Sequence, residues 1–120
     1  MMTLIDRACS VDVTESSRRV LNAAATEAGR CADELIGTGP LPGTVEWDAE
    51  QGTEIPAQRM LAWQLVSLRV QFGAGLDCIE TVIVLRTMAV SWEVIGRAVG
   101  MTRQAAHERW GARVKLILAE

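Results

Sequence analysis

The sequence predicts an all-α fold, a helical bundle in which an N-terminal helical part adjoins a C-terminal unit of three short helices. Apolar residues recur at spacings of three and four along each of the longer segments, as they do on one face of a helix. Residues typical of strands are scarce, with no Tyr and one Phe in the whole chain. Apolar residues make up 49% of the 120 residues, which is typical of a folded protein and enough for one small core.

The first helix is expected over residues 14–37. Thr14 or Ser16 can cap its start, and Gly37 can end it. One stripe of mostly small residues runs along it, made of Val20, Ala24, Ala28, Cys31 and Leu35. This stripe either packs on the next helix or forms a dimer interface. The preceding residues 1–13 show no sustained period and are expected to be a frayed terminus or an arm.

Residues 38–54 form the only long connection, and its prolines and glycines exclude a regular helix. The segment is acidic. Trp47 is its one aromatic residue, and we expect it to anchor the loop in an apolar notch. The alternative is that Trp47 binds a protein partner.

Two further helices are expected before the last stretch. One covers residues 55–72, where the apolar surface is wide enough to be buried on more than one side. The other covers residues 77–88, where Asp77 and Glu80 are spaced like a capping box. Apolar residues continue at 114–118 and are expected to pack on the N-terminal helices or on a second subunit.

Residues 91–111 predict two short helices joined by a tight turn. Ser91 and Thr102 are suitable N-caps for the two helices. Gly100 falls where the chain must leave the first helix, a position that favours positive φ. Gly96 has no side chain, so a second helix can cross it closely. Together these features describe a helix-turn-helix, whose second helix normally lies in the DNA major groove.

The pattern W-x-x-I-G-x-x-V-G-M-T-R-Q-A-A-x-x-R, at residues 92–109, resembles the helix-turn-helix of region 4 of bacterial sigma factors. It is also similar to small sigma-like DNA-binding domains of bacteria with high-GC genomes. The resemblance covers about the last third of the chain. It implies that the helix at 77–88 braces the motif from behind, so that the DNA-binding unit spans residues 77–118.

The side chains expected to meet DNA lie at the start of the second helix. Arg103 can donate two hydrogen bonds to a guanine edge, and Gln104 can pair with an adenine edge. Thr102 can hold a phosphate, and His107 lies one turn after Arg103. Phosphate contacts are expected from Ser91, Arg97, Arg109, Arg113 and Lys115. Each arginine has a simpler interpretation as a solvated charge, and Arg109 could instead pair with Glu93.

The net charge of −3 argues against a nucleic-acid binder, but the charges are unevenly distributed. Residues 1–85 carry six Arg and twelve acidic residues, a net of −6. Residues 86–120 carry six basic and three acidic residues, a net of +3. A basic working face on an acidic body is therefore expected.

Other classes of protein are disfavoured. The three cysteines have no metal-ligand spacing, the one His has no nearby Cys, and no nucleophile or glycine-rich phosphate motif is present. We therefore expect no enzyme activity, no cofactor and no metal. The absence of a long apolar run or a signal-peptide layout predicts a cytoplasmic protein that does not enter membranes.

The leading hypothesis is a sequence-specific transcription regulator that binds double-stranded DNA as a homodimer, with dimerisation in residues 1–75 and DNA binding in residues 76–120. A DNA-binding adaptor or an antitoxin-type subunit is the first alternative, and it needs a protein partner at the acidic loop near Trp47. A protein-interaction module that does not bind DNA is the second. Salt dependence distinguishes them, because DNA binding weakens steeply as salt rises.

Overall fold

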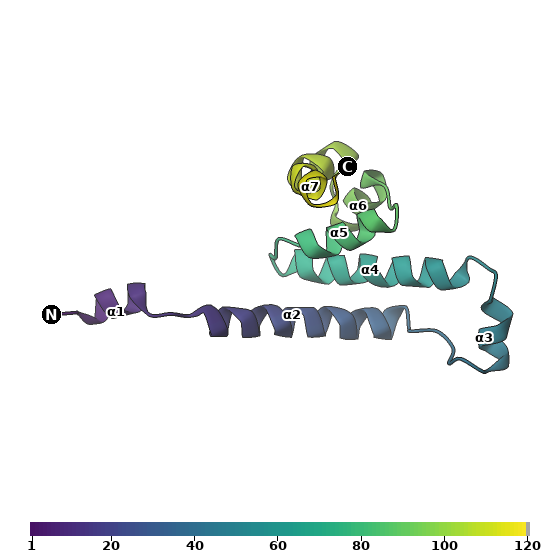
Figure 1. Ribbon diagram of the computed structural model, residues 1–120, viewed down its shortest axis with the longest axis horizontal. Helices are drawn as coiled ribbons and strands as arrows, with labels where there is room; N and C mark the ends of the chain where they lie inside the picture. Colours follow the sequence, from purple (N-terminus) through teal and green to yellow (C-terminus); the bar gives the residue numbers. More distant parts are fainter. Residues whose placement is uncertain (120) are drawn as a thin grey trace.

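The computed structural model describes residues 1–119, which contain α-helices and no strand, as the sequence predicts. The molecule is elongated, with extents of 70 × 34 × 26 Å (Figure 1). The helices in chain order are α1 (Leu4–Ser10), α2 (Thr14–Leu35), α3 (Val45–Glu50), α4 (Ile55–Gly73), α5 (Ile79–Thr87), α6 (Trp92–Val99) and α7 (Arg103–Leu118).

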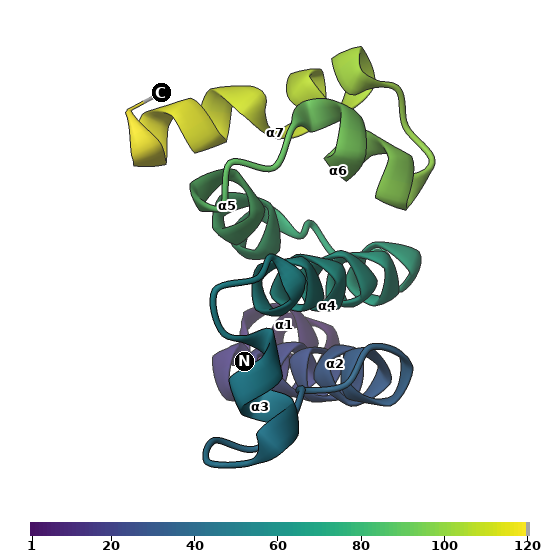
Figure 2. The same cartoon turned by 90° about the vertical axis from the view of Figure 1, so that its right-hand side faces the viewer.

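The helices are stacked in layers, with α4 between the long helix α2 and the C-terminal helices (Figures 1 and 2). α2 packs along α4 through small residues, and Ala28 and Ala32 are fully buried there. Gly29 continues this surface, because the Trp63 ring lies 3.6 Å from where a Cβ would stand. The Trp63 indole also donates a hydrogen bond of 2.8 Å to Asp33 on α2. Of the predicted stripe, Ala28 is buried and Ala24 and Cys31 are partly buried, whereas Val20 and Leu35 at its two ends are exposed.

The main core lies between α4 and the three C-terminal helices. Trp110 of α7 is fully buried at its centre, in edge-to-face contact with Phe72 of α4. Its indole N–H donates to the backbone oxygen of Asp77 at 2.9 Å, so the buried polar atom is satisfied. The other large, fully buried side chains are Leu68, Val82, Leu85, Ile95 and Val114.

The expectation that residues 38–54 contain no helix is wrong. The short helix α3 lies inside this segment, and the Thr44 hydroxyl caps it by accepting from the Trp47 N–H at 3.1 Å. Gly43 and Gly52 adopt positive φ on either side of α3. The glycines and prolines therefore delimit a helix instead of excluding one.

Two helix starts also differ from expectation. Residues 1–13 contain the helix α1, which Thr3 and Asp6 open with a reciprocal capping box. α5 begins at Ile79 without a side-chain cap, because Cys78 before it has a left-handed backbone with φ of 70°. The N-cap position belongs to Cys78, so Asp77 and Glu80 form no capping box; the Asp77 carboxylate accepts from the Ile79 N–H and pairs with Arg113.

The C-terminal apolar residues behave differently from one another. Val114 is buried and Leu118 packs on the edge of the core, whereas Leu116 and Ile117 are exposed. One expectation for residues 114–118 is packing on the N-terminal helices, and for Leu116 and Ile117 this expectation is wrong. None of the helices in residues 1–119 combines the length and the apolarity needed to cross a lipid bilayer.

Candidate nucleic-acid interface

The segment from Val90 to Met101 builds the helix α6 and the turn after it. The Ser91 hydroxyl accepts from the Val94 N–H at 3.2 Å, which confirms Ser91 as the N-cap of α6. Gly100 ends the helix with φ of 74°, a conformation that a glycine adopts without strain. The Met101 N–H then donates 2.8 Å back to the Gly96 oxygen, which closes the turn.

Gly96 is the position that allows the turn to fold this tightly. A Cβ on Gly96 would stand 2.7 Å from the backbone oxygen of Met101 and 2.9 Å from that of Thr102. The space above Gly96 is therefore filled by the backbone of the turn, and not by the side chains of a crossing helix. Because backbone atoms cannot rotate away, this contact fixes the direction in which α7 begins.

Thr102 opens α7 by accepting from the Ala105 N–H at 3.0 Å, which confirms it as the second N-cap. The exposed side chains that follow share one hollow, lined by Arg103, Gln104 and His107 of α7 and by Trp92 of α6. A second hollow beside it is lined by Arg86, Trp92, His107 and Lys115, among others. We call these six residues, Arg86, Trp92, Arg103, Gln104, His107 and Lys115, the α7 face.

His107 has a defined position on the α7 face. Its ring meets Trp92 edge-to-face with 5.5 Å between centroids, and it lies over Gly111 on the next turn of α7. A Cβ at Gly111 would come within 2.9 Å of the imidazole. The Trp92 ring therefore packs against the imidazole, and Gly111 leaves the space in which the imidazole lies against α7.

Arg86 and Trp92 belong to this face, although the sequence did not single them out for it. The Arg86 guanidinium lies 4.8 Å from the centroid of the Trp92 ring and donates 2.8 Å to the Val90 oxygen. The charge count shows that Arg86 belongs to the basic end of the chain. Its stacking on Trp92 depends on the orientation of α5 relative to α6, which the spacing of residues in the sequence does not indicate.

Three of the arginines predicted to contact DNA, Arg97, Arg109 and Arg113, lie apart from the α7 face. Arg97 lines a different hollow, together with Arg69 of α4 and Ile36. Arg109 lies over the rings of Phe72 and Trp110, with its guanidinium carbon 5.1 Å and 5.5 Å from the two centroids. The cationic side chain therefore stacks on aromatic rings of the core rather than on an acidic partner.

Arg113 makes the longest-range ion pair of α7. Its guanidinium donates two hydrogen bonds of 2.8 Å to the two carboxylate oxygens of Asp77. These hydrogen bonds lower the pKa of Asp77 and raise the pKa of Arg113. The pair, together with the Trp110 hydrogen bond to the same residue, ties the middle of α7 to the segment that precedes α5.

Three of the six residues of the α7 face are cationic, Arg86, Arg103 and Lys115, and Gln104 adds a hydrogen-bonding amide. This amide donates a 3.0 Å hydrogen bond to Glu108, which also lines the second hollow. Among residues 1–119 there is no cluster of three or more His, Cys, Asp or Glu side chains that could hold a metal ion.

Comparison of the chain with family models, with curated proteins and with solved structures finds no match.

Proposed function

We propose that this protein is a sequence-specific DNA-binding transcription regulator that acts as a homodimer. In this proposal α6 and α7 form a helix-turn-helix, and α7 enters the major groove as the recognition helix. One observation carries it. Two N-capped helices are joined by a glycine turn, and the first exposed side chains of the second helix are Arg103 and Gln104.

The recognition helix would read bases with the start of its exposed face. Arg103 would donate to the O6 and N7 of a guanine, and Gln104 would pair with N6 and N7 of an adenine. His107, held by Trp92, would reach a base edge or a phosphate from the next turn. Because Gln104 already bonds Glu108, its amide orientation is set before DNA arrives.

Phosphates would be held around this reading head. Ser91 and Thr102 stand at helix N-termini, where exposed N–H groups attract anions. Arg86 and Lys115 line the second hollow of the α7 face, and Arg97 lies on α6 beyond that face. For Arg109 and Arg113 we propose that bracing of α7 comes first, since a phosphate would have to compete with Phe72, Trp110 or Asp77.

A homodimer fits the size of the reading head. One short recognition helix reads few base pairs, and a two-fold pair multiplies the affinity by engaging two half-sites at once. The acidic N-terminal part would then face away from the DNA, because the phosphates repel its carboxylates.

The test is a mobility shift on fragments of the genome that encodes the protein, with Arg103→Ala/Gln104→Ala against wild type. A good bidentate contact to a base discriminates by about 1–3 kcal/mol, so the double variant should lose at least about tenfold in affinity for its preferred fragments. The matched control is Arg69→Ala/Gln58→Ala, which removes the same residue types from exposed positions of α4. Equal affinity and equal sequence preference in wild type and the double variant would refute the assignment.

A further inference from the structure

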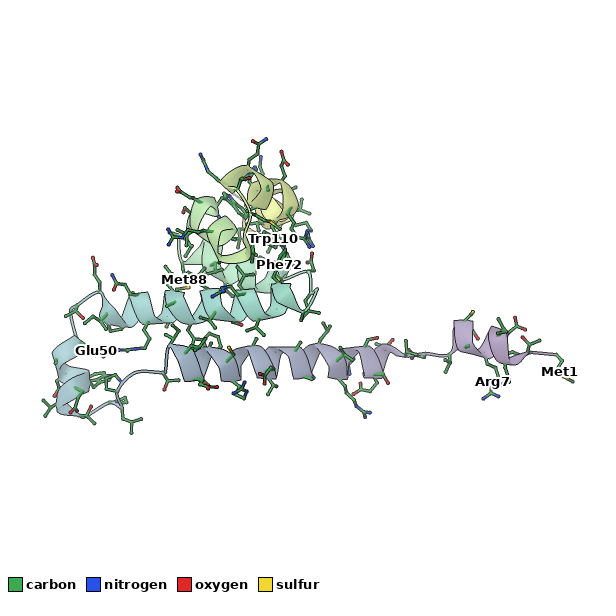
Figure 3. The ribbon with its side chains drawn as sticks, turned by 180° about the vertical axis from the view of Figure 1, so that it is seen from behind. Met1, Arg7, Glu50, Phe72, Met88 and Trp110 are labelled. Atoms are coloured by element: carbon green, nitrogen blue, oxygen red, sulfur yellow. The ribbon has the colours of Figure 1, made fainter. Side chains whose placement is uncertain are left out.

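Two apolar surfaces are uncovered at opposite ends of the long axis. At one end, α1 has no buried residue, and Leu4 and Ile5 are 77% and 73% exposed. At the other end, α3 and the start of α4 enclose a cavity of about 320 Å³, lined by Pro40, Trp47, Pro56, Met60, Trp63 and polar neighbours. Figure 3 labels Arg7 at the first end and Glu50 at the second.

The walls of the cavity are held in place without an occupant. Glu50 and Arg59 form an ion pair there, with only 14% and 23% of their side chains exposed. The Arg59 guanidinium also fills the space over Gly39, which fixes the loop before α3. Trp63 is tied to Asp33 by its indole hydrogen bond. The cavity is therefore preformed, as small apolar binding sites usually are.

α1 cannot reach the cavity of its own chain. α2 has 22 residues and is about 33 Å long at 1.5 Å per residue. The linker of residues 11–13 spans at most about 10 Å. α1 continues away from the N-terminal end of α2, whereas α3, which lines the cavity, lies beyond its C-terminal end (Figure 1). Only an α1 from another copy can lie there.

A two-fold axis that exchanges the arms has a predictable position. It must pass midway between residue 7 of α1 and residue 38 at the rim of the cavity. At about 1.5 Å per helical residue and 3.3 Å per extended residue, the midpoint falls near residues 20–22 of α2. The exposed apolar residues Val20 and Leu21, 64% and 57% exposed, lie at this midpoint. About such an axis, Val20 and Leu21 of one chain would therefore pack on Val20 and Leu21 of the second chain.

We propose that the homodimer forms by reciprocal exchange of α1, with the α2 helices antiparallel and each α1 against the partner's cavity. Leu4 and Ile5 would cover the cavity of the second copy, and Val20 and Leu21 would pack about the axis. Charges agree with this arrangement, since Arg7 of α1 would face the acidic segment 46–54, where Glu46, Asp48 and Glu54 are exposed. The inference rests on the homodimer of the proposed function, and it identifies the residues that form the dimer interface.

Native cysteines supply the first test. In the exchanged dimer, Cys9 of one chain lies within about two helical turns of Cys31 of the other. Within one chain the same two residues are about 40 Å apart. Because the spacing of about 8–10 Å between packed helices adds to the separation in the dimer, a hexane-bridged bismaleimide is the suitable reagent, and it should give covalent dimers whose peptide map contains a Cys9–Cys31 link. Cys9→Ser and Cys31→Ser should each abolish this link, and Cys78, which is buried, should remain unmodified. Dimers linked only through Cys9–Cys9 or Cys31–Cys31 would overturn the antiparallel exchange.

The second test measures mass by analytical ultracentrifugation. Leu4→Glu/Ile5→Glu should weaken the dimer at least tenfold, because two apolar side chains would lose their cover. Leu116→Glu/Ile117→Glu is the matched control, since these residues are also exposed, on α7, and its dimer should be unchanged. A wild-type dimer that the arm substitutions leave intact would overturn this inference alone. A monomeric wild type would overturn it together with the homodimer, while the Arg103/Gln104 mobility shift reports DNA binding separately.

Discussion

Substitution of Gly96 by Ala tests the physical basis of the turn between α6 and α7. The new Cβ would stand 2.7 Å and 2.9 Å from two backbone oxygens of the turn, closer than real Cβ atoms come. Relief of such overpacking costs about 1–3 kcal/mol, and the contact partners here are backbone atoms, which favours the upper end. The higher helix propensity of Ala returns about 1 kcal/mol. We expect a net loss of about 1–2 kcal/mol in the free energy of unfolding, or about 4–8 °C in melting temperature.

The assay is urea denaturation followed by circular dichroism, with Gly73→Ala as the matched control. Gly73 also lies in a helix without positive φ, and nothing stands within 4 Å of its Cβ position. Gly73→Ala should therefore leave stability unchanged or raise it by up to about 1 kcal/mol. If Gly96→Ala were as stable as Gly73→Ala, the tight turn described here would be wrong.

Two further substitutions test how α7 is held. Trp110→Ala empties the centre of the core and should cost about 3–5 kcal/mol in urea denaturation; a loss below about 1 kcal/mol would contradict its central place. Asp77→Asn tests the ion pair with Arg113. Because Arg113 lowers the pKa of Asp77, the pair contributes stability above the ordinary carboxyl pKa and loses it as pH falls through the lowered value. The melting temperature of wild type should therefore fall more steeply than that of Asp77→Asn between about pH 4 and pH 2; parallel curves would show that the pair contributes nothing.

The sequence predicts best where local chemistry decides the structure. Ser91, Gly100 and Thr102 act within one or two helical turns of themselves, and all three occupy the predicted cap positions. The fold class follows for the same reason, since helical periodicity is a local property.

Features that join distant segments were not predictable from spacing. Asp77 has the right spacing from Glu80 for a capping box, but its carboxylate meets Arg113, which is 36 residues away. Arg109 is predicted to contact a phosphate, with Glu93 as an alternative partner, whereas its guanidinium stacks on Phe72 of α4. α3 is not predicted, because the prolines and glycines of residues 38–54 indicate a segment without a helix. In the structure, Gly43 and Gly52 instead lie just before and just after this short helix.

The measurement that tests the central claim most directly is the affinity of the full-length protein for selected DNA at several salt concentrations. Binding-site selection from a random pool, followed by fluorescence anisotropy, supplies both the sequence and the affinity. We expect enrichment of a two-fold related site and an affinity that falls steeply as salt rises, because bound counterions are released when Arg and Lys meet phosphates. A pool without enrichment, or an affinity that does not change with salt, would contradict a role in DNA recognition.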